Sequence, residues 1–155
     1  MNRANVVAVV GEALRASLAA ALQAVDHSAG TARPDVHLKL LRVAASPVPR
    51  GRRPAPDEPP GEPPLALELE YLAWIDGAET DVEERLIGAV LAWLHTTPLH
   101  KVAARGEVAG SAVTWQVQLT PVSLERGELL RLWSLPEFSG RALLAFEARV
   151  LAGSG

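Results

Sequence analysis

The sequence predicts a protein that contains both helices and strands, of the α/β class in the broad sense and of the α+β class more specifically. We expect one mixed four-stranded sheet, covered on one face by about three helices, in the order α-β-β-α-β-α-β. Two observations support this. Apolar residues alternate along four short segments, which is the period of a strand with one buried face. Along three other segments they recur every three or four residues, which is the period of a helix. With 155 residues the chain is expected to form a single domain, 1–155.

The clearest elements lie between residues 64 and 94. Apolar residues alternate over 65–75, which predicts a strand, and the alternation stops at the turn pair Asp76-Gly77. Helical spacing then continues to residue 94. Thr80 and Glu83 have the spacing of a capping box, in which each side chain binds the backbone N–H of the other residue. We therefore place this strand and helix at the centre of the fold.

The same patterns assign the rest of the chain. A helix is expected over 5–25 and a shorter one over 124–135, with Ser123 as the N-cap. Strands are expected over 36–43, 112–120 and 141–151, and a polar connection over 99–111. Three tryptophans fall on apolar stripes and are expected in the core: Trp93, Trp115 and Trp133.

Residues 46–64 form a long proline-rich loop within the domain, because they hold eight of the twelve prolines. Arg50, Arg52 and Arg53 lie in this loop beside three acidic residues. The formal net charge is -3, whereas nucleic-acid binders normally carry a basic surface. We therefore expect a solvated or protein-contact loop and no nucleic-acid partner.

Leu72 and Trp74 share a strand face with Glu68 and Glu70. Large apolar side chains on a face that otherwise looks solvated need a cover. The pattern leaves two covers open, a helix of this chain or a neighbouring subunit. The candidate protein-interface residues are therefore Arg50, Arg52, Arg53, Leu72 and Trp74.

The sequence offers little catalytic chemistry. The carboxylates of Glu68 and Glu70 are expected ~7 Å apart, which would suit a hydrolytic pair, but we interpret them as part of the solvated face of a half-buried sheet. His95 and His100 are five residues apart with Pro98 between them, whereas a metal pair on one helix face needs a spacing of four. Cysteine is absent. We therefore expect that the protein is not an enzyme and that it has no catalytic residues, no metal site and no cofactor.

The N-terminal residues loosely imitate a signal peptide, with Arg3 followed by an apolar run. Glu12 and Arg15 interrupt that character, so we expect neither a signal peptide nor a membrane-spanning helix.

The order of segments resembles the cap, or tail-terminator, proteins of extracellular contractile injection systems, which are phage-tail-like particles of bacteria. The resemblance runs over nearly the whole chain, and its most specific pieces are PPLALELEYL, IGAVLAWLHTTP and LTPVSLERGELLRLWS. The chain departs from the family pattern in two places. Its proline loop is short, and LPEFSGR lacks the aromatic residue that often precedes the final strand.

The resemblance implies a fold similar to phage tail terminators and a structural role with no catalytic residues. Such proteins form a ring, here a homo-hexamer, at the baseplate-distal end of the particle. The ring ends polymerisation of the inner tube and sheath and anchors the last sheath layer. The implied partners are further copies of the chain and the sheath and tube subunits, without a membrane. The implied location is the cytoplasm of the producing bacterium, within a particle that can be released.

Two alternatives stay open at this point. One is a phage tail completion protein of the same fold, which gene neighbourhood would distinguish. The other is a small α/β hydrolase or ligand-binding domain that uses Glu68, Glu70 and the histidines.

Overall fold

The structure is a computed structural model that describes residues 6–23, 35–46, 66–76, 79–97, 99–105 and 112–152. Within these ranges the helices are α1 (Val6–Gln23), α2 (Thr80–Thr96) and α3 (Arg126–Trp133). The strands are β1 (Asp35–Ser46), β2 (Ala66–Asp76), β3 (Leu99–Arg105), β4 (Ala112–Val122) and β5 (Leu143–Ala152). The α+β class is confirmed.

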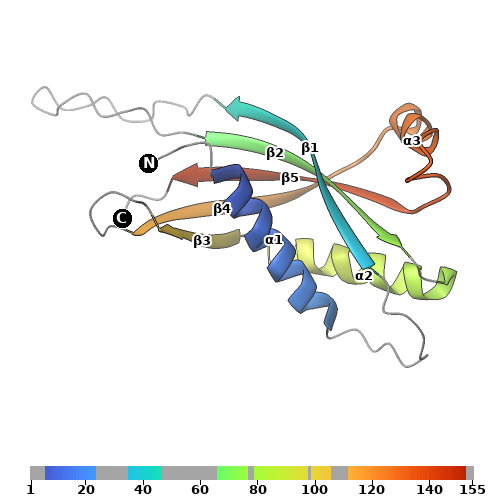
Figure 1. The fold of residues 1–155 in the computed structure, drawn as a ribbon, viewed down its shortest axis with the longest axis horizontal. Coiled ribbons are helices and arrows are strands. Elements are labelled where there is room, and N and C mark those ends of the chain that lie inside the picture. Colours follow the sequence, from blue (N-terminus) through green and yellow to red (C-terminus); the bar gives the residue numbers. More distant parts are fainter. Residues whose placement is uncertain are drawn as a thin grey trace, which may run out of the picture.

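The strands form one sheet in the order β1-β2-β5-β4-β3, and every pair of neighbours is antiparallel (Figure 1). The expectation of four strands in a mixed sheet is therefore wrong. The additional strand is β3, which runs through the segment expected to be a polar connection and pairs with β4 from Leu99 opposite Gln118 to Arg105 opposite Ala112. This strand depends on its partner, because its own sequence has only a weak apolar pattern.

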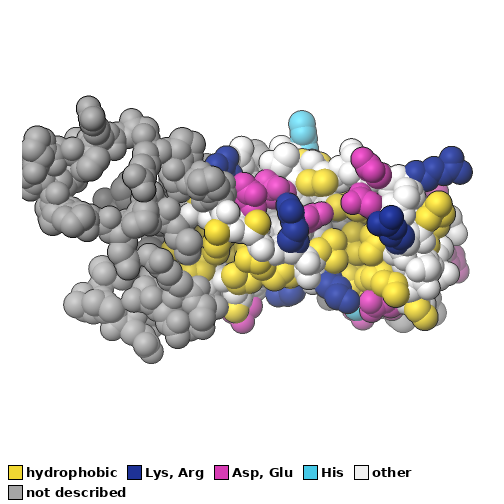
Figure 2. Space-filling model, turned by 90° about the horizontal axis from the view of Figure 1, so that it is seen from above, with side chains coloured by type: hydrophobic (Ala, Val, Ile, Leu, Met, Phe, Trp, Pro, Cys, Tyr) yellow, Lys and Arg dark blue, Asp and Glu magenta, His cyan; other side chains and the backbone are white. Residues whose placement is uncertain are grey.

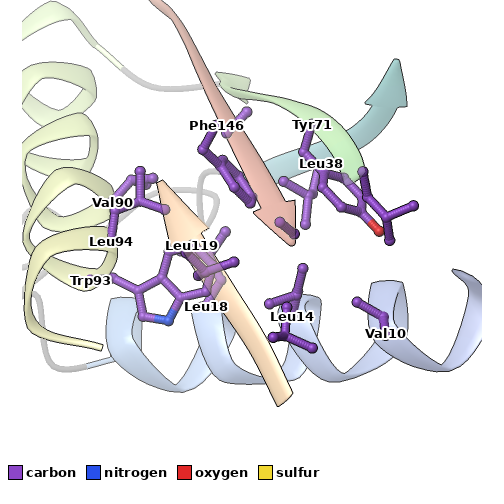
Figure 3. Packing of buried hydrophobic residues seen from close by; sticks show 14 of the residues in the cluster. Val10, Leu14, Leu18, Leu38, Tyr71, Val90, Trp93, Leu94, Leu119 and Phe146 are labelled. Carbon is purple, nitrogen blue, oxygen red and sulfur yellow. The ribbon is translucent and has the colours of Figure 1, made fainter. Parts of the chain in front are cut away.

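Helices α1 and α2 pack together on one face of the sheet, called here the core face, which carries Tyr71 of β2 and Phe146 of β5 (Figure 3). The indole Nε1–H of Trp93 on α2 donates a hydrogen bond to Ser17 Oγ on α1, at 3.0 Å. Trp93 and Trp115 are each 3% exposed, which confirms the prediction that both belong to the core. Helix α2 thus carries the chain across the core face from β2 to the far edge of the sheet at β3.

Helix α1 is long and apolar enough to cross a membrane when judged by length and composition alone. In the fold, however, one side of it is buried against the sheet through Val10, Leu14 and Leu18, while Glu12 and Arg15 are exposed. This one-sided burial is the arrangement of a helix in the core of a folded domain.

The opposite sheet face, called here the outer face, is also covered in part. A second apolar cluster there contains Leu72, Ala145 and Phe138, with Leu124 and Leu132 packed against it. The segment that includes α3 therefore lies on the outer face, so the expectation of helices on one face only is wrong. This cluster accounts for the apolar residues that β2 directs away from the core face.

The predicted helix caps differ from those in the structure. Glu79 is the N-cap of α2, so the predicted Thr80–Glu83 capping box is wrong. The Glu83 carboxylate instead accepts a hydrogen bond from the backbone N–H of Ala142, at 3.0 Å. Glu125, not Ser123, caps α3, and its backbone N–H donates to the carboxylate of Glu128 at 3.1 Å.

Candidate functional site

Leu72 and Trp74 receive their cover from this chain. Leu72 is 0% exposed, so it has no free surface with which to contact a partner. Trp74 is half-buried between two rings. It stacks on His37 with the centroids 5.0 Å apart and meets Phe138 edge-on at 4.9 Å. Of the two covers considered, the structure shows the one within the chain, and a contact between Trp74 and a neighbouring subunit stays a prediction.

Polar contacts hold the part of the covering segment that follows α3. The Lys39 ammonium lies 3.2 Å from the Glu137 carboxylate and 5.6 Å from the centre of the Phe138 ring. Closer to β5, Arg141 Nη1 lies 2.6 Å from Asp76 Oδ1. All four charged side chains are partly exposed, so these pairs mainly fix position and contribute little stability.

The two acids of the outer face are not arranged as a catalytic pair. Glu70 lies 3.2 Å from the guanidinium of Arg42, and Glu68 stands opposite Arg149 in the register of β2 and β5. Each acid therefore has a cation beside it or across from it, as on a solvated sheet face. At the start of α2, a hydrogen bond from Arg85 lowers the pKa of the Asp81 carboxyl below its ordinary value.

The described histidines do not converge on these acids. His37 lies against Trp74, four residues along β2 from Glu70, about 13 Å at the rise of a strand. His95 is exposed near the end of α2, which packs on the opposite face of the sheet. The described part of the chain contains no group of three His, Asp or Glu residues placed to hold a metal ion. The hydrolase alternative therefore has no assembled site in these residues.

Three predicted interface residues, Arg50, Arg52 and Arg53, lie outside the described residues. The same is true of His27 and of the side chain of His100.

Helix α3 and the turn that follows it expose large apolar side chains that the sequence pattern did not single out as a surface. Leu130 is 55% exposed, Leu135 45% and Trp133 37%, so the expectation that Trp133 is buried is wrong. The indole Nε1–H of Trp133 donates to the backbone carbonyl of Arg141 at 2.8 Å, which satisfies its polar atom within the chain. The exposed part is therefore apolar ring, and tryptophan is among the residues that contribute most to protein interfaces.

Other exposed apolar side chains lie on β1 and α2. Leu41 and Val43 are 41% and 49% exposed on β1, which is an edge strand with a β-bulge after Leu40. Leu91 on α2 is 45% exposed. Seen from the β1 side, hydrophobic side chains lie among acidic and basic ones on the surface (Figure 2). A surface of this mixed kind is suited to protein contacts.

The comparisons with known proteins agree with this description. The family model described as Pvc16 N-terminal domain matches residues 6–152. Among solved structures, the fold is similar to the chain titled "Cryo-EM Structure of an Extracellular Contractile Injection System, PVC sheath/tube terminator in extended state", with a TM-score of 0.57 and 14% sequence identity. The alignment covers 95% of this chain and 56% of that one, so this chain spans little more than half of its length. Comparison with curated proteins gives no match.

Proposed function

The chain belongs to the Pvc16 N-terminal domain family, and from this premise we propose that it is a terminator subunit of a contractile injection system. In this role it binds the baseplate-distal end of the inner tube and sheath, ends their polymerisation and anchors the last sheath layer. The observation that carries the proposal is the family match over 6–152, joined to a fold similar to that of a sheath/tube terminator. The role is structural and needs no catalytic group.

The terminator acts as a ring of identical copies. Six copies give the ring the same rotational symmetry as a tail with six-fold symmetry. Identical subunits close into a ring through a heterologous contact, in which two different surfaces of each copy meet. The exposed apolar side chains on α3, β1 and α2 supply separate surfaces for such a contact and for the sheath and tube subunits. Assembly takes place in the cytoplasm of the producing bacterium, and the finished particle carries the ring with it.

A phage tail completion protein of the same fold is the second candidate. The structural similarity to a terminator of an injection system favours the first candidate. The genes beside this one distinguish the two, because an injection system lacks the capsid genes that a phage requires.

The location of the chain on the particle tests the proposal. A tagged chain is expressed with its neighbouring genes, and the particles are labelled with gold through the tag. Label at the end opposite the baseplate, on most particles, is the expected result. Label along the sheath, at the baseplate or on no particle would contradict the proposal.

A further inference from the structure

Two helices of this chain present exposed stripes with the same spacing. On α2 the stripe consists of Glu84, Gly88 and Leu91, and on α3 it consists of Arg126, Leu130 and Trp133. In both, the steps are four and then three residues, so the members of each stripe follow one side of their helix. All six residues are exposed. The two stripes can therefore face each other level by level when the helices run parallel.

We infer that the α3 stripe of one copy packs on the α2 stripe of a second copy. This inference rests on the proposed ring and specifies the contact that builds it. Three levels result, in which Arg126 meets Glu84, Leu130 meets Gly88, and Trp133 meets Leu91 of the second copy.

The first level is an ion pair. Within the described residues neither Glu84 nor Arg126 has an ion-pair partner, whereas the nearby Asp81 is held by Arg85 at 2.7 Å. Opposite charges at one end of the two stripes fix the direction in which the helices pack, because the antiparallel arrangement would place Arg126 beside Leu91.

The second and third levels are matched in shape. A Cβ atom built on Gly88 would find nothing within 4 Å, so the surface of α2 is open there to a protruding side chain. Leu130, the most exposed large apolar side chain in the described part of the chain, is such a side chain. At the third level Leu91 and Trp133 bury apolar surface against each other, which removes both from water.

The positions of the two stripes favour a ring over a closed dimer. Helix α2 packs on the core face of the sheet, whereas α3 belongs to the segment that covers the outer face (Figure 1). Each copy therefore offers one stripe on either side of its sheet. A contact between unlike surfaces leaves a free stripe at each end of a pair, and successive additions continue until the ring closes.

Charge reversal tests the pairing. In the full chain, Glu84→Arg or Arg126→Glu alone is expected to weaken self-association by about tenfold or more, measured by sedimentation over a range of concentrations. The double variant, with both charges exchanged, is expected to recover association to within about threefold of the wild type. Two single defects without recovery in the double variant would overturn the pairing, as would single variants that associate normally.

Gly88→Leu tests the second level without a clash inside the chain, because the position is open. It is expected to abolish association while the far-ultraviolet circular dichroism stays unchanged. Ala20→Leu places the same side chain on the exposed side of α1 and serves as the matched control. Equal effects of the two variants would overturn the assignment of α2.

Cross-linking identifies the surfaces directly, because the chain contains no cysteine. Leu91→Cys and Leu130→Cys in one chain, treated with a short bismaleimide, are expected to give a ladder of covalent oligomers that ends at the ring size. A mixture of the two single variants is expected to stop at dimers. The control is a chain with Val43→Cys and Leu130→Cys, which is expected to form no covalent oligomers. A ladder in the control, or none in the test pair, would overturn the contact.

The two proposals fail in different ways. If the wild type forms a ring but the test pair does not cross-link, this contact is wrong and the terminator role stands. If the pair cross-links into a ring but the tagged chain is absent from the particle end, the contact stands and the terminator role is wrong. A wild type that stays monomeric in the presence of tube subunits would overturn the contact.

Discussion

Phe138 meets Trp74 edge-on, with the ring centroids 4.9 Å apart and the ring planes at 89°. Phe138 lies in the turn after α3, and Trp74 lies near the end of β2. Since α3 has no buried residue of its own, while Phe138 is only 2% exposed, this contact is the main apolar anchor of the segment on the outer face.

Phe138→Ala is therefore expected to reduce the free energy of unfolding by about 3–5 kcal/mol, because it removes a buried ring and leaves a cavity over Leu72. Urea denaturation measures the loss. Leu135→Ala, at an exposed position of the same segment, is the control, with an expected loss of up to about 0.5 kcal/mol. Equal losses in the two variants would show that Phe138 is not the anchor.

Gly11 lies where α1 passes close to β2. A Cβ atom there would be 3.5 Å from Tyr71 Oη and 3.1 Å from Arg15 Nη1, the mobile end of a long side chain. Gly11→Ala is thus expected to stabilise the protein by up to about 1 kcal/mol, because alanine has lower conformational entropy than glycine in the unfolded chain. Gly11→Leu is expected to be destabilising, since its larger side chain collides with Tyr71. Thermal unfolding of both variants checks this, and a destabilising alanine would show that the contact with Arg15 is rigid.

Tyr71 makes stability depend on pH in the alkaline range. Burial raises the pKa of its hydroxyl above 10.0, and the charge of Arg15 acts in the opposite direction. Above that pH the unfolded chain loses the proton while the folded chain keeps it, so the unfolded state binds fewer protons and stability falls as the pH rises. Tyr71→Phe is expected to remove this part of the pH dependence.

The pKa of Tyr71 can be measured without interference from other tyrosines, because it is the only one in the chain. The ultraviolet absorbance of tyrosinate in the folded protein is expected to develop at a higher pH than in urea. Coincident titrations in the two states would contradict the raised pKa.

The sequence was sufficient for the elements that combine strong periodicity with length. The β2–α2 unit and α1 fall close to their predicted ranges because each buries a continuous apolar stripe against the sheet. Strand β3 could not be predicted in this way. It exists through its pairing with β4, and LHKVAAR has no clear alternation of its own. The capping box at α2 was predicted wrongly because the Glu83 carboxylate accepts its hydrogen bond from the backbone N–H of Ala142, which is distant in the sequence.

The surface was less predictable than the core. The alternation in β2 indicated that Leu72 and Trp74 needed a cover, but it could not show that Phe138 supplies it, because that contact joins residues far apart in the chain. Trp133 fits an apolar stripe on α3, yet the helix meets the sheet on another side and leaves the ring exposed. The 4-then-3 spacing shared by α2 and α3 was present in the sequence, and it became informative only once both stripes were known to be exposed.

The length of the sheath and tube tests the central claim most directly. Particles are produced from the gene cluster with this gene intact, deleted, or deleted and restored from a plasmid, and their lengths are measured by electron microscopy. The terminator role predicts a narrow length distribution with the intact or restored gene. Without the gene, it predicts sheaths and tubes of variable length or sheaths lost from the tube. An unchanged length distribution, with intact sheaths, in the deletion strain would contradict the claim.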